Sequence, residues 1–92
     1  MKKIKLSKEF EFEGKKYTEL TIDFDKLTGR DIIAAEKEAS GFAGRPVLDI
    51  DKTYQAVIAA KAAGVVSDLI LDLPACDFVS VTGAAQDFLL DI

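Results

Sequence analysis

Apolar and polar residues alternate along the first quarter of the chain. Side chains two residues apart lie on one face of a β-strand, so this alternation predicts half-buried strands. The apolar positions of the first strand are Ile4, Leu6, Phe10 and Phe12. Gly14 lies where such a strand would reverse. The stretch from Ile4 to Phe24 therefore predicts an antiparallel β-hairpin.

The returning strand contains a change of phase. Leu20, Ile22 and Phe24 share one face, whereas Tyr17 has the opposite parity. Because a slip of one residue turns every following side chain to the other face, we expect a β-bulge or register shift between Tyr17 and Leu20. Two strands alone are only marginally stable in water, so the hairpin must pack on helices.

The pattern changes to helical spacing after the hairpin. Thr28 followed by Asp31 has the spacing of a capping box, which predicts a helix start. Gly41 is placed to end this helix in a left-handed conformation. The apolar stripe between these ends consists of Ile32, Ala35 and Ala39, with Ile33 beside it.

A second helix follows, capped by Asp49 or Asp51 and closed by Gly64. Tyr54, Val57 and Ile58 follow helical spacing. The small side chains that would let another helix approach closely are Ala56, Ala59, Ala60, Ala62 and Ala63. Residues 65–73 are compatible with a short helical turn or an extended connector, and we favour the turn.

The last helix begins around Pro74, with Asp72 as its expected cap and Asp77 in its first turn. Its apolar stripe is Phe78, Val81, Ala85, Phe88 and Leu89. Glycine in the middle of a helix is unfavourable, so Gly83 suggests close contact with a neighbour. These patterns predict an α+β fold, with a hairpin (residues 1–25) packed on about three helices (residues 28–92).

Composition agrees with a single globular domain spanning residues 1–92. The 92 residues are 49% hydrophobic and 30% charged, which fits a folded chain too short for two cores. The net charge of −4 and the pI of about 4.7 argue against nucleic-acid binding. No apolar run is long enough to cross a bilayer or to form a signal peptide, so we expect the cytoplasm.

The chain offers little for catalysis or metal binding. It has no histidine and one cysteine, Cys76, which we interpret as a small buried residue near a helix start. Asp49 and Asp51 resemble the opening of a calcium loop, but Tyr54 and Ala60 stand where that loop needs glycine and glutamate. We therefore predict no catalytic residue, no cofactor and no metal.

Charge is unevenly distributed along the chain. Residues 62–92 contain five aspartates and no lysine or arginine, a net charge of −5, whereas residues 1–61 contain twelve bases and eleven acids, a net charge of +1. Solubility and helix capping are one explanation. The alternative is an acidic, apolar-striped surface that binds a helical partner with basic residues.

Two segments carry a family resemblance: "LTGRD" (Leu27 to Asp31) and "LPACDFVSVTGAAQDFL" (Leu73 to Leu89). In this order, after a charged hairpin, the chain resembles the small tail assembly chaperones of contractile-tailed bacteriophages. The resemblance implies an ATP-independent holdase of the host cytoplasm, with no catalytic residues. It would hold the tape measure protein until tail tube protein polymerises around it, and it would be absent from the virion.

We expect the last helix to bind the partner by helix-in-groove contact. The predicted partner-binding residues are Phe78, Val81, Phe88, Leu89 and Leu90. A core role is an equal alternative for Phe78 and Val81, and the three residues near the carboxyl end could instead meet a second copy of the chain. Rival functions are a bacterial or prophage adaptor or regulatory module with no assembly role, and a permanent structural tail subunit.

Overall fold

The N-terminal hairpin pairs β1 (Lys2–Phe12) with β2 (Lys15–Ile22) in the computed structural model, which describes residues 1–90. Glu13 and Gly14 connect the strands and both have positive φ, 51° and 79°. Two such residues make the tight turn whose twist matches that of the flanking strands. The predicted reversal at Gly14 is confirmed.

The hairpin changes register near its middle. The paired blocks are Lys2–Lys5 with Glu19–Ile22, and Phe10–Phe12 with Lys15–Tyr17. Residues 6–9 of β1 consequently lie opposite Thr18 alone. The expected register shift between Tyr17 and Leu20 is confirmed, although the extra residues belong to the opposite strand. Such an insertion bends the strand and leaves backbone groups outside the ladder.

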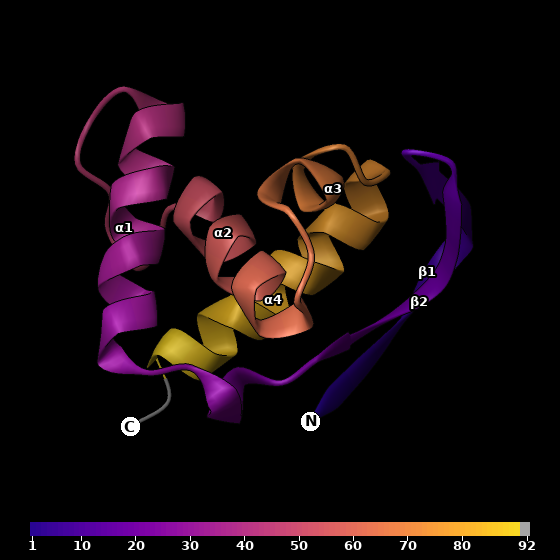
Figure 1. Ribbon diagram of the computed structural model, residues 1–92, viewed down its shortest axis with the longest axis horizontal. Helices are drawn as coiled ribbons and strands as arrows, with labels where there is room; N and C mark the ends of the chain where they lie inside the picture. Colours follow the sequence, from indigo (N-terminus) through magenta and orange to yellow (C-terminus); the bar gives the residue numbers. More distant parts are fainter. Residues whose placement is uncertain (91–92) are drawn as a thin grey trace.

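The rest of the chain is helical. Its elements are η1 (Phe24–Lys26), α1 (Gly29–Ala43), α2 (Lys52–Ala63), α3 (Ser67–Leu71) and α4 (Ala75–Leu90). Figure 1 shows α2 in the middle of the molecule, where it contacts α1, α3, α4 and β2. The predicted α+β fold is confirmed, and α3 is the short helical turn that the sequence favoured.

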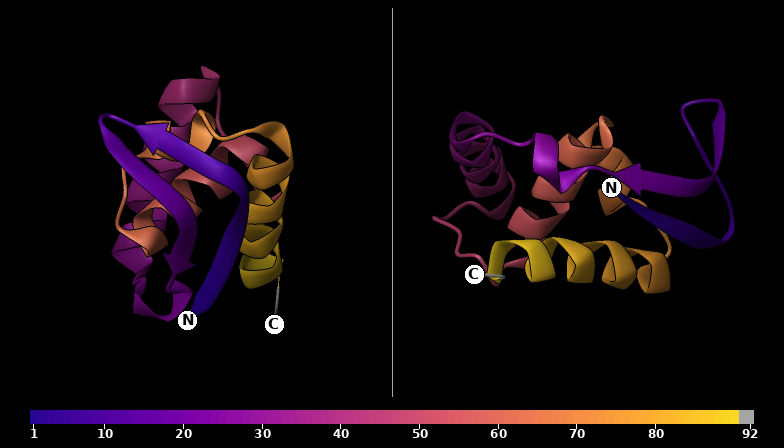
Figure 2. Two further views of the ribbon diagram at one scale, coloured as in Figure 1. Left: turned by 90° about the vertical axis from the view of Figure 1, so that its right-hand side faces the viewer. Right: turned by 90° about the horizontal axis from the view of Figure 1, so that it is seen from below.

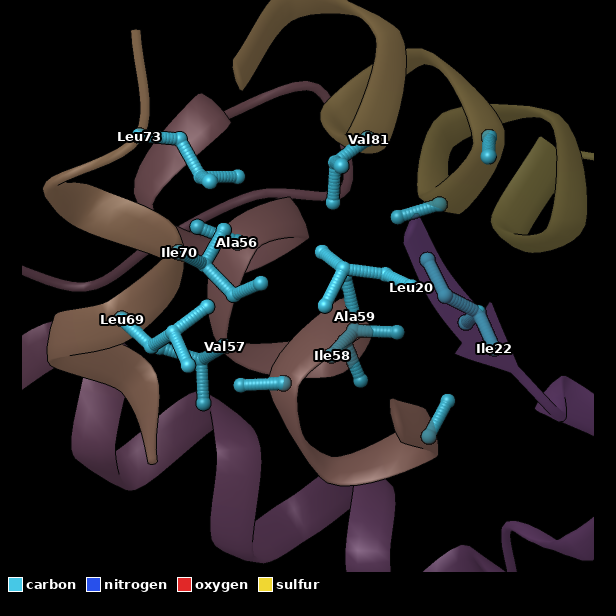
Figure 3. Close-up of a cluster of buried hydrophobic side chains, with 14 of the residues drawn as sticks. Leu20, Ile22, Ala56, Val57, Ile58, Ala59, Leu69, Ile70, Leu73 and Val81 are labelled. Carbon is cyan, nitrogen blue, oxygen red and sulfur yellow. The ribbon is translucent and has the colours of Figure 1, made fainter. Parts of the chain in front are cut away.

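The core forms around α2. Residues 54–60 are buried without interruption, so this helix has no solvent face at its centre. Its alanines are small enough for elements on several sides to pack closely, as the sequence indicated. Figure 3 shows the side chains of α2 meeting Leu20 and Ile22 from β2 and Leu69 and Ile70 from α3. Gly64, with φ 72°, ends α2 as predicted.

The first helix is capped as predicted but ends later than expected. Thr28 and Asp31 form a capping box. The helix passes through Gly41 to Ala43 and ends at Gly44, whose φ is 71° and whose N–H donates to Ser40 O at 2.8 Å. The prediction at Gly41 was wrong because an ordinary helical conformation suits that glycine. A left-handed residue is needed only where the chain turns away.

Two other expected boundaries differ. β2 ends at Ile22, so Phe24 lies in η1 instead of on the strand face. Asp72 closes α3, with its N–H donating to Asp68 O at 3.0 Å, and does not cap the last helix. That helix starts after Pro74, whose carbonyl accepts from the N–H of Phe78 at 2.9 Å.

The hairpin lies against the helices along β1. Figure 2 shows β1 running beside α4, while the tip of the hairpin projects beyond the helices. Ile4 and Leu6 are buried on the helix side of β1. This arrangement places the first residues of the chain beside the last helix.

Candidate functional site

The structure divides the predicted partner-binding residues between core and surface. Val81 is 0% exposed and lies among the core side chains of α2, α3 and β2 (Figure 3). Phe78, Phe88 and Leu89 are partly buried and pack against the same core. Leu90 is 48% exposed. Val81 thus has the core role given above as its alternative, and partner binding by the other four stays a prediction.

Phe88 makes a specific contact inside the chain. Its ring stacks on Phe24 of η1, with ring centroids 4.9 Å apart and an interplanar angle of 12°. Aromatic pairs of this kind contribute more than their buried area alone. Phe88 therefore fastens η1 to the end of α4, and a partner can reach only the part of its ring that the fold leaves exposed.

The outer face of α4 is formed by Val79, Gly83, Gln86 and Leu90, at helical spacing. Val79 is 55% exposed. A Cβ at Gly83 would meet no atom within 4 Å beyond its chain neighbours and the adjacent backbone of its own helix. The interpretation of Gly83 as a close contact within the fold is therefore wrong, and the glycine instead leaves a bare position on the surface of the helix.

This outer face borders a surface groove of about 520 Å³, which we call the α4–β1 groove. It is lined by Val79, Ser80, Gly83, Ala84, Gln86 and Asp87 from α4 and by Lys2, Lys3 and Ile4 from β1. Figure 2 shows the two elements running side by side. The helix side is mainly apolar or small, and the strand side carries two lysines.

A second hollow of about 520 Å³ lies between β2 and the junction of α2 with α3. Its apolar lining includes Tyr17 and Val66. Its charged lining consists of Glu13, Lys15 and Glu19. Two acids and one base line this wall, so the hollow carries a net negative charge and does not attract an acidic partner.

One aspartate of the last third is buried and cannot contribute to an acidic surface. Asp77 is only 4% exposed and accepts two hydrogen bonds from Ser7. Asp68 and Asp87 lie on different helices, α3 and α4. Asp91 lies outside the described residues. Among residues 1–90, no three histidine, cysteine, aspartate or glutamate residues lie close enough to hold a metal ion.

The acid that resembled a calcium ligand is engaged within its own loop. Both carboxylate oxygens of Asp51 accept from Arg45 at 3.1 Å, and one also accepts from the N–H of Leu48 at 2.7 Å. The Arg45 hydrogen bonds, followed by that of Leu48, lower the pKa of Asp51 below its ordinary value. Asp51 stands at the N-cap position of α2 without bonding its first turn through its side chain.

Cys76 is exposed, so its interpretation as a buried apolar residue was wrong. It lies in the first turn of α4, on a side that faces away from the core. The sequence also gave no sign that Leu48 and Ile50, in the loop before α2, would each be 66% exposed. Neither residue belongs to a periodic stripe, which is the only signal that assigns a face from sequence.

The sequence also gave no indication that two lysines line the strand side of the groove. Lys2 and Lys3 belong to a strand at one end of the sequence, and α4 lies at the other end. Periodicity assigns a residue to a face of its own element, but it does not say which distant element that face meets. Only the folded chain could reveal that basic residues border the helix regarded as acidic.

The fold is a small α+β domain with an exposed groove beside its last helix. A family model described as "Phage tail assembly chaperone proteins, E, or 41 or 14" matches residues 3–90. The chain therefore belongs to the phage tail assembly chaperones, which confirms the resemblance. The searches of curated proteins and of solved structures found no match.

Family membership sets the coarse function. Chaperones are not a class of enzyme, and a tail assembly chaperone binds proteins of the phage tail. None of the helices within residues 1–90 has both the length and the apolar character needed to span a membrane.

Proposed function

We propose that this chaperone binds the tape measure protein in the host cytoplasm while the tail assembles, acting as an ATP-independent holdase. The observation that carries the proposal is the family match over residues 3–90. A tape measure protein is long and largely helical, so its apolar faces are exposed to water until the tube encloses it. A small partner that binds these faces transiently would prevent their aggregation.

Helix-in-groove contact fits the surface that α4 presents. Val79 and Leu90 are exposed, and the exposed parts of Phe78 and Leu89, on the adjoining side of the helix, can extend the apolar area. Each anchor that becomes buried would contribute on the order of 1.5–3 kcal/mol. A few such anchors give binding of roughly micromolar strength, which polymerising tail tube protein can displace.

The test is co-expression with a tape measure fragment from the same phage genome, followed by measurement of the soluble fragment. We expect the wild-type chaperone to raise the soluble fraction and Val79→Asp/Leu90→Asp to reduce that effect severalfold. The matched control is Leu48→Asp/Ile50→Asp, which places the same charges on another exposed apolar pair. Phe88→Asp is unsuitable because it also breaks the stack on Phe24.

The outcomes distinguish an error in the proposed holdase function from an error in the proposed binding surface on α4. If the wild-type chain leaves the fragment insoluble, the holdase function is wrong. If both double variants work as well as the wild type, the function stands and the α4 surface is wrong. Circular dichroism of each purified variant confirms that the fold is intact.

Absence from the finished particle is a separate part of the proposal. A chaperone displaced by tail tube protein leaves no copy in the tail, whereas a structural subunit remains at a fixed ratio. Mass spectrometry of purified virions distinguishes the two. Peptides of this chain at a stoichiometry comparable to tail proteins would contradict the chaperone cycle and favour the structural role.

A further inference from the structure

We infer that the α4–β1 groove binds a helical segment of another protein that carries acidic residues along one edge of a small or apolar face. The inference rests on the proposed chaperone function and specifies the chemistry of the client segment. It also reverses the charge expected from the sequence, where the acidic last third suggested a basic partner.

The shape of the groove favours a helix. Exposed Val79 and Leu90 lie at the two ends of the outer face of α4, with the bare position of Gly83 between them. Ser80 and Ala84 beside Gly83 are also small. Helix axes approach most closely where the facing side chains are small, so a partner helix can lie along α4 at this point.

The charge of the groove selects an acidic helix. Lys2 and Lys3 line its strand side, and residues 1–8 contain four lysines and no acid. Within residues 1–90, neither Lys2 nor Lys3 takes part in an ion pair. Asp87 is the one acid in the lining. Acids on the partner that face the strand side would meet the lysines, and charges at such a rim control specificity and association rate.

The α4 helix of a second copy of this chain matches the groove poorly. This helix has two acids among the described residues, and one of them, Asp77, is buried against Ser7. Only Asp87 of that helix could face the lysines. The second hollow, beside β2, has two glutamates and one lysine in its lining, so its excess charge is negative and would repel an acidic helix.

The test uses two fluorescein-labelled helical peptides of about 20 residues. They share one alanine- and leucine-rich face and differ only in carrying glutamate or lysine along its edge. Fluorescence anisotropy at low salt measures the Kd of each for the wild-type chain. We expect the glutamate peptide to bind about tenfold more tightly, with the preference shrinking as salt increases.

Charge reversal locates the binding site. Lys2→Glu/Lys3→Glu is expected to abolish or invert the preference for the glutamate peptide. The matched control is Arg30→Glu/Lys37→Glu, which makes the same change of charge on exposed positions of α1. This control is expected to keep most of the preference, because net charge acts weakly compared with charges that line the groove.

Filling the groove tests its shape independently of charge. Gly83→Gln adds a long neutral side chain where a Cβ has open space. We expect it to raise the Kd for the glutamate peptide by about tenfold. Gly83→Ala is the matched variant that leaves the groove open and keeps affinity. Both substitutions favour helix, so loss of the fold does not confound the comparison.

Several results would overturn the inference. They are equal affinity for the two peptides, an unchanged preference in Lys2→Glu/Lys3→Glu, or a wild-type dimer that Gly83→Gln converts to a monomer, measured by light scattering. The inference fails while the proposed chaperone function stands if Lys2→Glu/Lys3→Glu still keeps a tape measure fragment soluble. If the wild-type chain binds the glutamate peptide in the groove but no tape measure fragment, the proposed function fails instead.

Discussion

The carboxylate of Asp77 in α4 accepts two hydrogen bonds from Ser7 in β1, one from the backbone N–H and one from the hydroxyl, each 2.9 Å long. Ser7 lies in the segment of β1 where the register shifts. A backbone N–H freed from the ladder at such a point needs another acceptor when it is buried. Asp77 supplies that acceptor and thereby joins the hairpin to the last helix.

Removal of this carboxylate should destabilise the chain. Asp77→Ala leaves the Ser7 donors without their acceptor, so we expect the free energy of unfolding to fall by about 1–3 kcal/mol in urea denaturation. Asp77→Asn keeps one acceptor oxygen and should cost less. Ser7→Ala/Asp77→Ala should cost less than the sum of the single variants, and strict additivity would show that the contact contributes nothing.

Two glycine-to-alanine substitutions should have opposite effects. Gly83 is helical with open space around its Cβ, so Gly83→Ala should raise the free energy of unfolding by up to about 1 kcal/mol. Gly64 ends α2 with φ 72°, and Gly64→Ala should cost about 1–2 kcal/mol because that conformation is strained for alanine. Thermal melts of both variants provide the measurement. Equal shifts would contradict the assigned backbone conformations.

The aromatic stack should be detectable by a double-mutant cycle. Phe24→Ala and Phe88→Ala each remove a partly buried ring, and we expect each to cost about 1–3 kcal/mol. The double variant should reveal a coupling of about 0.5–1.5 kcal/mol, because the rings are stacked. Leu90→Ala, on the exposed side of the same helix, should stay within about 0.5 kcal/mol of the wild type. A coupling near zero would contradict the stack.

Acid should weaken the fold partly through Asp31 and Asp51. The hydrogen bond from the Thr28 backbone lowers the pKa of Asp31, and hydrogen bonds from Arg45 lower that of Asp51. A lowered pKa in the folded state gives stability that is present above the unfolded pKa of about 3.9 and is lost as the pH falls through the folded pKa.

The control for this pH dependence is Asp31→Asn/Asp51→Asn. We expect its melting temperature to lie below that of the wild type near neutral pH, and the two to converge below about pH 4, as the wild-type carboxylates become protonated. A constant difference from pH 7 to pH 2 would show that the two carboxylates contribute no pH-dependent stability.

Local features of the fold were predictable because their causes lie within a few residues. The turn at Gly14, the cap at Thr28, the end of α2 at Gly64 and the short α3 all depend on short-range backbone preferences. The end of α1 was misplaced because two nearby glycines both satisfied those preferences. Arg45 and Pro46, directly after Gly44, are the local signal that would have selected the later one.

The candidate site was predicted less completely. Periodicity assigned Val81 and Phe88 to one stripe of the last helix, but it could not say how much of each the rest of the chain would cover. Most of the stripe is buried in the core, and the exposed surface of α4 is the neighbouring face, which contains Val79 and Leu90. Burial is a property of packed pairs of elements, so a stripe alone does not distinguish core from interface.

The sequence by itself determined the α+β class and the order and type of the main secondary-structure elements, since these depend on residue type and nearby spacing. Tertiary structure decided that Asp77 is buried against Ser7 and that Lys2 and Lys3 line the groove beside α4. These pairs are separated by most of the chain. Their meeting depends on how every intervening element packs, and no local pattern encodes it.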